Sequence, residues 1–367
     1  MKNKCLALII CTFAHTSIQA SPNDLFLTAK NPQFNTKTGL SITVAIDAVN
    51  DKIDFLDFRA KEGIQDNQTG DYIGGHILAE YILNPNWKFD AGYWDREIQY
   101  ASDENKIKSA QIGVTFTPDL NLSKNDALAF KLSAWTNTAS DLKKSTSSHI
   151  NGYVFDQITV KNPEDLQLQL DAIFSKKIDF MNTLSVLGNV GYSKVKVNEL
   201  EVSTRYQNCA MNINIGSDNQ YSGQLAQPCQ IDNTIVHKLD ISGQAEEFGL
   251  NMQKDLNYDS YYASLGGSWN LKYKKFESQI AYQYQRLWRN DIDDRVSNFS
   301  NQPIKDNHTL GVKFSYDITP KISTFVQGEL YKHNFVGKIP FLYNGVTASR
   351  LDKKYGIASL GLNFKLF

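Results

Sequence analysis

Apolar residues occupy every second position through long stretches of this chain, and this period of two limits the possible folds more than any other feature of the sequence. Successive side chains of a β-strand point to opposite faces, so such a stretch forms a strand with one apolar and one polar face. In the segment Leu166–Phe174, for example, three leucines alternate with two glutamines and an aspartate. The pattern predicts twelve strands, which contain Leu40–Ile46, Ile77–Leu83, Trp87–Tyr93, Ile112–Phe116, Leu128–Ala134, Leu166–Phe174, Leu184–Tyr192, Tyr261–Leu271, Phe276–Tyr284, Leu310–Ile318, Thr324–Tyr331 and Gly356–Leu366.

The predicted connections between these strands are alternately short and long. The short ones are rich in Pro, Asn, Asp and Lys, as turns are; they are Asn84–Asn86, Thr117–Asp126, Lys176–Asn182, Lys272–Lys275 and Asp317–Lys321. The long ones are Asn50–Asp71, Glu97–Lys106, Asn137–Asp165, Lys196–Tyr258, Arg289–Asp306 and Asn334–Lys353. An even number of antiparallel strands, with short turns at one end and long loops at the other, is typical of a transmembrane up-and-down β-barrel. We therefore expect an all-β antiparallel barrel of twelve strands, or of fourteen if Gly152–Val160 or part of the longest loop adds a hairpin.

Alternation alone does not tell which face of a barrel is apolar, and three further features decide it together. The first is strand length: these strands span roughly 9 to 13 residues, and a tilted membrane strand needs about 9–11. The second is the asymmetry of the loops. The third is an N-terminal export signal. Lipid cannot satisfy backbone amides, so membrane strands must pair round a complete ring. We expect the apolar side chains to face lipid and the polar ones to face inward.

The first twenty residues have the layout of a cleavable secretory signal: Lys2 and Lys4, an apolar run from Cys5 to Phe13, and Ala20 before the expected cleavage site. A lipoprotein signal at Cys11 is the alternative, and the large residues before that cysteine disfavour it. We expect residues 21–38 to be a periplasmic lead-in and residues 39–367 to form the barrel.

Two cysteines, Cys209 and Cys229, remain after the signal is removed, and both fall in the longest predicted loop, residues 196–258. Two cysteines in an exported chain most often pair, so we expect a disulfide. The bond would either staple an exposed loop or brace a loop that folds toward the pore. Two cysteines without nearby partners do not predict a metal site, and His237 is too isolated to complete one.

The charge of the chain excludes one class of partner. The formal net charge is −1, and loss of two lysines with the signal makes it −3. A chain without a basic surface is not expected to bind nucleic acid. The sequence also contains no phosphate-binding loop, dinucleotide fingerprint or zinc spacing, and we expect no cofactor and no metal.

Aromatic residues gather near the ends of the predicted strands, where the two bilayer interfaces should lie. Such girdles suit rings with an apolar body and, in Tyr and Trp, a polar tip. Beside the short turns these are Trp87, Phe116, Phe174, Trp269, Phe276 and Tyr316, and toward the long loops Tyr93, Tyr192, Tyr261 and Tyr284. The alternative is ordinary β-propensity, which also favours aromatic residues in strands.

The last strand, Tyr355–Phe367, ends on an aromatic residue and resembles the C-terminal signal of bacterial outer-membrane proteins that the barrel-assembly machinery reads. It departs from the usual form, because Phe367 is out of phase with the apolar residues before it. The resemblance implies the porin-like superfamily of Gram-negative outer-membrane β-barrels, surrounded by outer-membrane lipid and lipopolysaccharide. In strand count the chain is similar to narrow twelve-stranded channels for nucleosides or acidic sugars, without a shared motif that identifies a subfamily.

The polar faces of the predicted strands should line the barrel interior. They mix both signs of charge with many amides; the candidate pore-lining residues are His76, Glu80, Lys88, Asp90, Gln111, Lys131, Gln167, Gln169, Asp171, Gln279, Gln283, Lys313, Gln327 and Glu329. Such a wall suits passive diffusion of small hydrophilic solutes. The alternative is a solid interior in which the charges pair, as in small barrels.

Two other functions remain open from the sequence. One is a surface adhesin or receptor whose pore is blocked, which the longest loop favours. The other is a lipid-modifying enzyme, for which Asp306, His308 and His333 are the only candidate group. No nucleophile motif accompanies them, so we do not expect an enzyme. The transported solute and the oligomeric state do not follow from the sequence.

Overall fold

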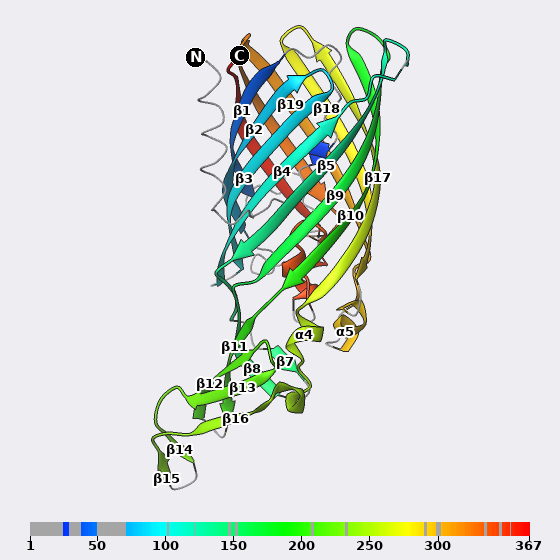
Figure 1. The fold of residues 1–367 in the computed structure, drawn as a ribbon. Coiled ribbons are helices and arrows are strands. Elements are labelled where there is room, and N and C mark those ends of the chain that lie inside the picture. Colours follow the sequence, from blue (N-terminus) through cyan, green and yellow to red (C-terminus); the bar gives the residue numbers. More distant parts are fainter. Residues whose placement is uncertain are drawn as a thin grey trace, which may run out of the picture.

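The computed structural model shows a closed, tilted barrel with a smaller β-sheet beyond one of its ends (Figure 1). The structure describes residues 25–28, 38–49, 71–100, 103–120, 122–145, 148–150, 153–206, 209–231, 234–289, 292–298, 302–333, 336–344, 347–352 and 354–367. The predicted signal peptide and most of the predicted loop at residues 50–71 lie outside the described residues.

Twelve antiparallel strands form the barrel, and pairing of the first with the last closes it. This confirms the predicted fold class and strand number. The strands, in their order round the barrel, are β1 (Gly39–Val49), β2 (Asp71–Asn84), β3 (Trp87–Tyr100), β4 (Asp103–Phe116), β5 (Asp126–Ala139), β9 (Glu164–Lys177), β10 (Asn182–Lys196), β17 (Tyr258–Tyr273), β18 (Phe276–Arg289), β19 (Asp306–Thr319), β20 (Ile322–Tyr331) and β21 (Tyr355–Lys365).

The two ends of the barrel differ as predicted, with one exception. At the end that holds the C-terminus, here called the turn end, all connections are short; the other end is called the loop end (Figure 1). The predicted long loop Glu97–Lys106 is wrong, because β3 runs to Tyr100 and β4 begins at Asp103. Near the loop end, the apolar residues move from the outward-facing to the inward-facing positions of β3 and β4. Ile98 and Ile107 point inward and are buried, while the charged Glu97 and Lys106 lie on the outward face.

The segments that might have extended the barrel to fourteen strands form a separate sheet at the loop end instead. This seven-stranded sheet, with its two-stranded hairpin β14–β15, is called the loop-end sheet (Figure 1). Its strands are β6 (Asp141–Lys144), β7 (Ser148–Ile150), β8 (Tyr153–Lys161), β11 (Glu199–Tyr206), β12 (Cys209–Gly216), β13 (Gln220–Leu225) and β16 (Asp240–Gln244); the hairpin pairs β14 (Cys229–Ile231) with β15 (Thr234–Val236).

The helices are short. They are α2 (Leu25–Thr28), η1 (Ala245–Phe248), α4 (Met252–Asp255), α5 (Ile292–Asn298), η2 (Pro340–Leu342) and α6 (Ala348–Leu351). Within the described ranges, no helix is both long and apolar enough to span a bilayer.

The outer surface of the barrel is apolar, as is required of a barrel surface that faces lipid. Leu132, Leu170 and Val190 lie side by side on β5, β9 and β10, and about half of the surface of each is exposed. The aromatic residues at the strand ends also point outward and pair across strands. The ring centroids of Trp87 and Phe116 are 4.7 Å apart, those of Phe276 and Tyr316 are 4.8 Å apart, and those of Tyr192 and Tyr261 are 5.3 Å apart. Tyr93, Phe174, Trp269 and Tyr284 are likewise exposed on the outer face.

Candidate functional site: the barrel interior

All fourteen predicted pore-lining residues point to the inside of the barrel. Eleven are buried: Glu80, Asp90, Gln111, Lys131, Gln167, Gln169, Asp171, Gln279, Gln283, Gln327 and Glu329. His76, Lys88 and Lys313 lie on the same inward face and are partly buried. The inward face is thus a polar wall, as the alternation predicts.

The charged residues of this wall pair with one another. The Lys131 Nζ lies 2.9 Å from the Asp90 Oδ1, and the Gln111 Nε2 donates to the Asp90 Oδ2 over 2.9 Å. The Lys88 Nζ lies 3.4 Å from the Glu80 Oε1. Pairing of this kind offsets the cost of removing charges from water.

Other polar atoms of the wall are buried without a hydrogen-bond partner within the described ranges. They include the Trp135 Nε1, the Gln167 Oε1, the Ser264 Oγ and the Gln283 Nε2. Buried polar atoms usually have partners, and an unpaired one costs about 1–3 kcal/mol. These atoms can therefore donate to or accept from a hydrated solute that enters the barrel.

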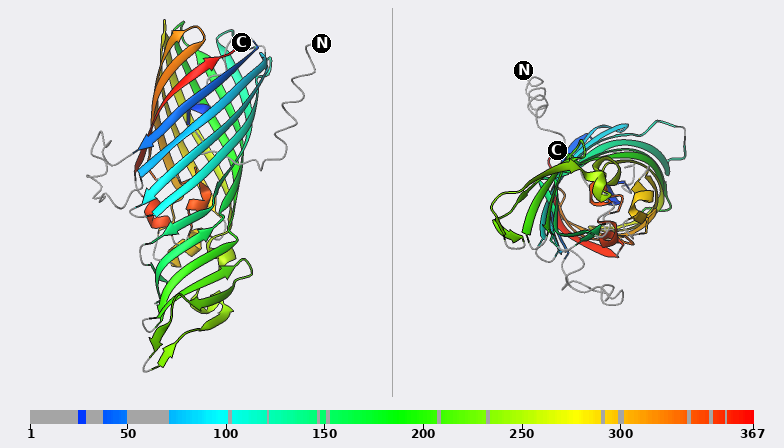
Figure 2. Two further views of the ribbon diagram at one scale, coloured as in Figure 1. Left: turned by 90° about the vertical axis from the view of Figure 1, so that its left-hand side faces the viewer. Right: turned by 90° about the horizontal axis from the view of Figure 1, so that it is seen from below.

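Two apolar side chains of the N-terminal segment occupy the middle of the barrel. Helix α2 lies within the ring of strands (Figures 1 and 2), and Leu25 and Phe26 are almost fully buried against β18 and β19. Gly311 makes room for them: a Cβ atom there would lie 2.8 Å from the Phe26 Cζ and 3.0 Å from the Leu25 Cδ2. Leu25 and Phe26, called the plug here, block part of the interior.

The segment between β20 and β21 closes the loop end from the inside. The carbonyl of Lys338 accepts hydrogen bonds from Asn137 over 3.4 Å and from Gln167 over 3.3 Å. The backbone N–H of Phe341 donates to Asp165 over 3.3 Å. These contacts join the segment to the inner wall of β5 and β9.

An apolar core surrounds this segment and fills the loop end, and it is called the mouth core here. Its members come from the barrel strands, the loop-end sheet, the segment of η1 and α4, α5 and the β20–β21 segment, with Leu287, Leu200, Met252, Ile292 and Phe341 as examples. The Tyr258 hydroxyl donates to the carbonyl of Pro340 over 2.6 Å within it. The barrel is therefore closed at this end.

The plug and the mouth core are the features that the sequence reasoning missed. Residues 21–38 were expected to be a lead-in, and only residues 25–28 and 38 of this segment are described. The signal in the sequence is the apolar run Leu25–Leu27 in an otherwise polar stretch. Likewise Val336, Ile339 and Phe341 are apolar residues in the predicted long loop Asn334–Lys353, and all three are buried.

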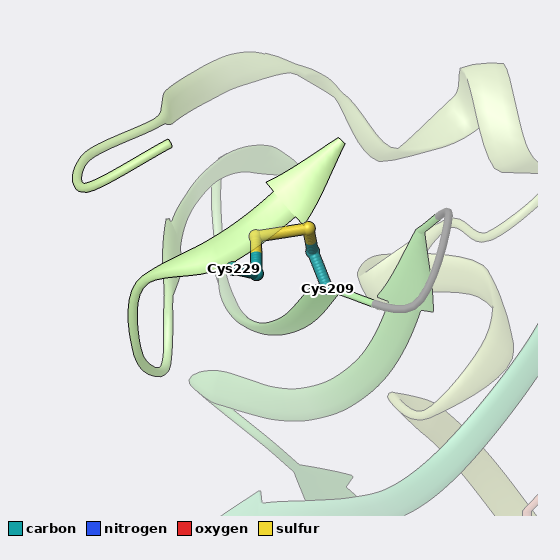
Figure 3. The surroundings of a disulfide bond; sticks show 2 residues. All are labelled: Cys209 and Cys229. Carbon is teal, nitrogen blue, oxygen red and sulfur yellow. A yellow bond between two sulfur atoms is a disulfide. The ribbon is translucent and has the colours of Figure 1, made fainter. Parts of the chain in front are cut away.

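The predicted disulfide is present. Cys209 at the start of β12 is bonded to Cys229 on β14, 20 positions later, and so ties the β14–β15 hairpin to the loop-end sheet (Figure 3). Cys209 is fully buried. The bond is a staple outside the barrel, and it does not line the interior.

Replacement of both cysteines by serine should destabilise the loop-end sheet. A loop of this length predicts a loss of about 3 kcal/mol in its free energy of unfolding. Hydrogen exchange of β12 to β14 should become faster, whereas exchange of the barrel strand β9 should be unchanged. Equal exchange in the two proteins would show that the bond contributes no stability.

The candidate catalytic group does not assemble. The His308 Nε2 lies 3.6 Å from the Asp306 Oδ2, but His333 lies against Asp352, with 3.0 Å between the Nδ1 and the Oδ1. The His308 Nδ1 is hydrogen-bonded to the Tyr282 hydroxyl over 2.7 Å, on the outer face of the barrel. In the parts of the chain that the structure describes, no three His, Cys, Asp or Glu residues are placed to hold a metal ion.

We expect the packing at the loop end to depend on pH through His333. It follows β20 and lies outside the membrane-spanning strands. Burial lowers the pKa of His333, and the nearby Asp352 carboxylate opposes this only in part. The unfolded state therefore binds the proton more readily than the folded state does. As the pH falls below about 6.5, protonation of His333 favours the unfolded state and lowers the stability of the packing at the loop end.

We expect hydrogen exchange at residues 336–344 to be more protected at about pH 7.5 than at about pH 5.5, after correction for the intrinsic rate. A His333→Gln variant should lose most of this difference. A variant that keeps the full pH dependence would exclude His333 as its source.

Among known proteins, the chain is similar to solved structures but matches neither a family model nor a curated protein.

The similar solved structures are outer-membrane β-barrels. The translocator domain of the autotransporter NalP from Neisseria meningitidis is 10% identical, with a TM-score of 0.47, over 93% of this chain and 92% of that one. The CymD monoaromatic hydrocarbon channel is 10% identical, with a TM-score of 0.40, over 95% of both chains. The KdgM porin in complex with disordered oligogalacturonate is 7% identical, with a TM-score of 0.39, over 89% of this chain and 99% of that one.

Proposed function

We propose that the protein is an outer-membrane channel for passive diffusion of small hydrophilic solutes, and that the conformation described above is the closed one. The observation that carries this proposal is the inner wall, where charges pair and buried polar atoms such as the Gln283 Nε2 have no partner within the described ranges. A barrel that served only as an anchor would gain stability from apolar side chains at these positions, because unpaired buried polar atoms cost free energy.

The proposed location is the outer membrane of a Gram-negative bacterium, with the turn end in the periplasm and the loop end outside the cell. Exposed apolar residues such as Leu170 would contact lipid, and lipopolysaccharide would surround the loop end. The last strand, β21, would be recognised by the barrel-assembly machinery. It ends at Lys365, and the terminal Phe367 is mostly exposed.

Swelling of proteoliposomes in sugar solutions tests the proposed solute class. We expect the purified protein to admit arabinose faster than glucose, and glucose faster than sucrose, because the lumen of a twelve-stranded barrel is narrow. Protein-free liposomes and liposomes with heat-denatured protein are the controls. Swelling no faster than in these controls, for every sugar and also for the Leu25→Asp, Phe26→Asp double variant, would contradict the proposal.

The mouth core favours a second candidate, a surface-recognition protein with a permanently blocked pore. The apolar side chains of this core join the loop-end sheet to the barrel, so that the sheet would be presented at the outer end. Replacement of residues 199–244 by a short linker would remove most of the loop-end sheet. Loss of attachment of whole cells to host tissue, with solute flux unchanged, would support the second candidate over the channel.

A further inference from the structure

The wall around the plug is a separate apolar patch inside the barrel. Ile173 on β9, Leu187 on β10 and Ala281 on β18 are buried on the inward face, and together with Leu25 and Phe26 they form one apolar cluster. Inward positions of a water-filled lumen are normally polar. An apolar patch there can hold an apolar group, and in the closed protein that group belongs to the chain itself.

The ammonium group of Lys313 lies beside this apolar patch. The Lys313 Nζ lies 5.7 Å from the centre of the Phe26 ring and 4.2 Å from the centre of the Phe325 ring. A lysine ammonium at such distances is attracted by the face of a ring. The plug therefore presents an aromatic ring to a lysine and a leucine side chain to the apolar patch.

Amide side chains flank Lys313 on both neighbouring strands. Gln279 on β18 is directly opposite Lys313 in the pairing of β18 with β19, and Gln327 is directly opposite it in the pairing of β19 with β20. Both glutamines are buried on the inward face, and the Gln327 Nε2 donates one of its two N–H groups to the Glu329 Oε1 over 3.3 Å. An ammonium group and two amides are the donors that a carboxylate accepts from.

We propose that this wall is a binding site for a small organic anion with an apolar body, such as an aryl or alkyl carboxylate. The apolar body would occupy the space of Leu25 and Phe26, and the carboxylate would meet Lys313 and the two glutamines. The plug is then an internal competitor that the solute displaces. The inference rests on the proposed channel function and narrows its solute class from any small hydrophilic molecule to an amphipathic anion.

Binding of 4-fluorophenylacetate to the full-length protein in detergent, followed by fluorine NMR, tests the site without requiring conduction. Replacement of both plug residues by alanine should strengthen binding at least about tenfold, because it removes the competitor. Lys313→Met should weaken binding about tenfold, since one charge-assisted hydrogen bond is lost. The uncharged 4-fluorophenylacetamide should bind about tenfold more weakly than the anion for the same reason.

Two further variants make the result specific. Ile173→Asn should weaken binding of the anion and of the amide alike, because both share the apolar body. Lys321→Met, which removes an exposed lysine from the turn between β19 and β20, should change nothing. Equal affinities in the wild type, the plug variant and Lys313→Met would overturn the site.

The outcomes separate this inference from the function on which it rests. Sugar flux without binding of the anion would overturn the site and leave the channel. Binding without any flux would overturn the channel, and the patch would then be an anion-binding site in a closed barrel.

Discussion

Cells that produce the Leu25→Asp, Phe26→Asp double variant should take up small hydrophilic probes, such as a chromogenic β-lactam, far faster than cells that produce the wild type. Leu25 and Phe26 are 1% and 4% exposed, and each contributes about 1.5–3 kcal/mol of apolar burial to the docked plug. Losing both contributions lowers the equilibrium constant for docking by on the order of a hundredfold or more, and the undocked fraction rises by a similar factor. The plug and the mouth core lie in series, so the probability of an open path is the product of the probabilities that each is open. A larger undocked fraction of the plug therefore raises the flux by the same factor, even though the mouth core is unchanged.

The matched control is Leu25→Ile with Phe26→Leu, which keeps the apolar character of the plug and should keep the low permeability of the wild type. Equal amounts of folded protein in the outer membrane, shown by heat-modifiable migration on gels, must accompany the comparison. Uptake that is the same in the double variant and in this control would mean that the plug does not limit flux.

Replacement of Leu170 by arginine should give the largest loss of stability of any single outward substitution in β9. Leu170 lies at the middle of this strand, is 48% exposed and is flanked by Leu132 and Val190. A cation at the centre of the bilayer costs about 2–4 kcal/mol on the outward face of a barrel. Reversible urea unfolding in phospholipid vesicles measures the change in the free energy of unfolding.

Leu166→Arg is the control for this measurement. It lies on the same face of β9 but at the loop end, and it is 47% exposed. Near the interface the cost falls to about 0–1 kcal/mol. Equal losses at the two positions would mean that the outward face of β9 does not span a bilayer with Leu170 at its centre.

The membrane-facing part of the barrel could be predicted from the sequence because lipid and lumen impose opposite chemistry on alternate residues. In β9, Leu166, Leu168 and Leu170 face out while Gln167 and Gln169 face in, and the alternation of outward and inward side chains continues along the strand, with the apolar Ile173 as an inward exception. The closed barrel of twelve strands followed from such segments. The strand ends were less well predicted, because the chain there leaves the lipid.

Beyond the apolar belt, the outward face meets water and the inward face meets the mouth core, so the alternation reverses its phase. Arg96 and Ile98 share the inward face of β3, whereas Asp95 and Glu97 face out. A strand prediction based on apolar residues at every second, outward-facing position therefore ends the strand at this reversal. For this reason the pattern predicts a long loop at residues 97–106, whereas β3 runs to Tyr100 and β4 begins at Asp103.

The polar wall of the candidate site was predictable, and the plug and the mouth core were not. The inward placement of residues such as Gln169 and Lys131 follows from the period of two, which is local. The contact of Phe26 with Gly311, and that of Lys338 with Asn137 and Gln167, join parts of the chain that are far apart. Such contacts depend on the closed shape of the barrel, which no short pattern in the sequence contains.

The central claim, that the barrel is a channel held closed from within, is tested most directly by single-channel currents of the purified protein in a planar bilayer. The wild type should show rare, brief openings. The Leu25→Asp, Phe26→Asp variant should open far more often with the same current per opening, because the polar wall that sets the conductance is unchanged. Silence in both folded proteins would contradict the account and identify a barrel with a permanently blocked pore.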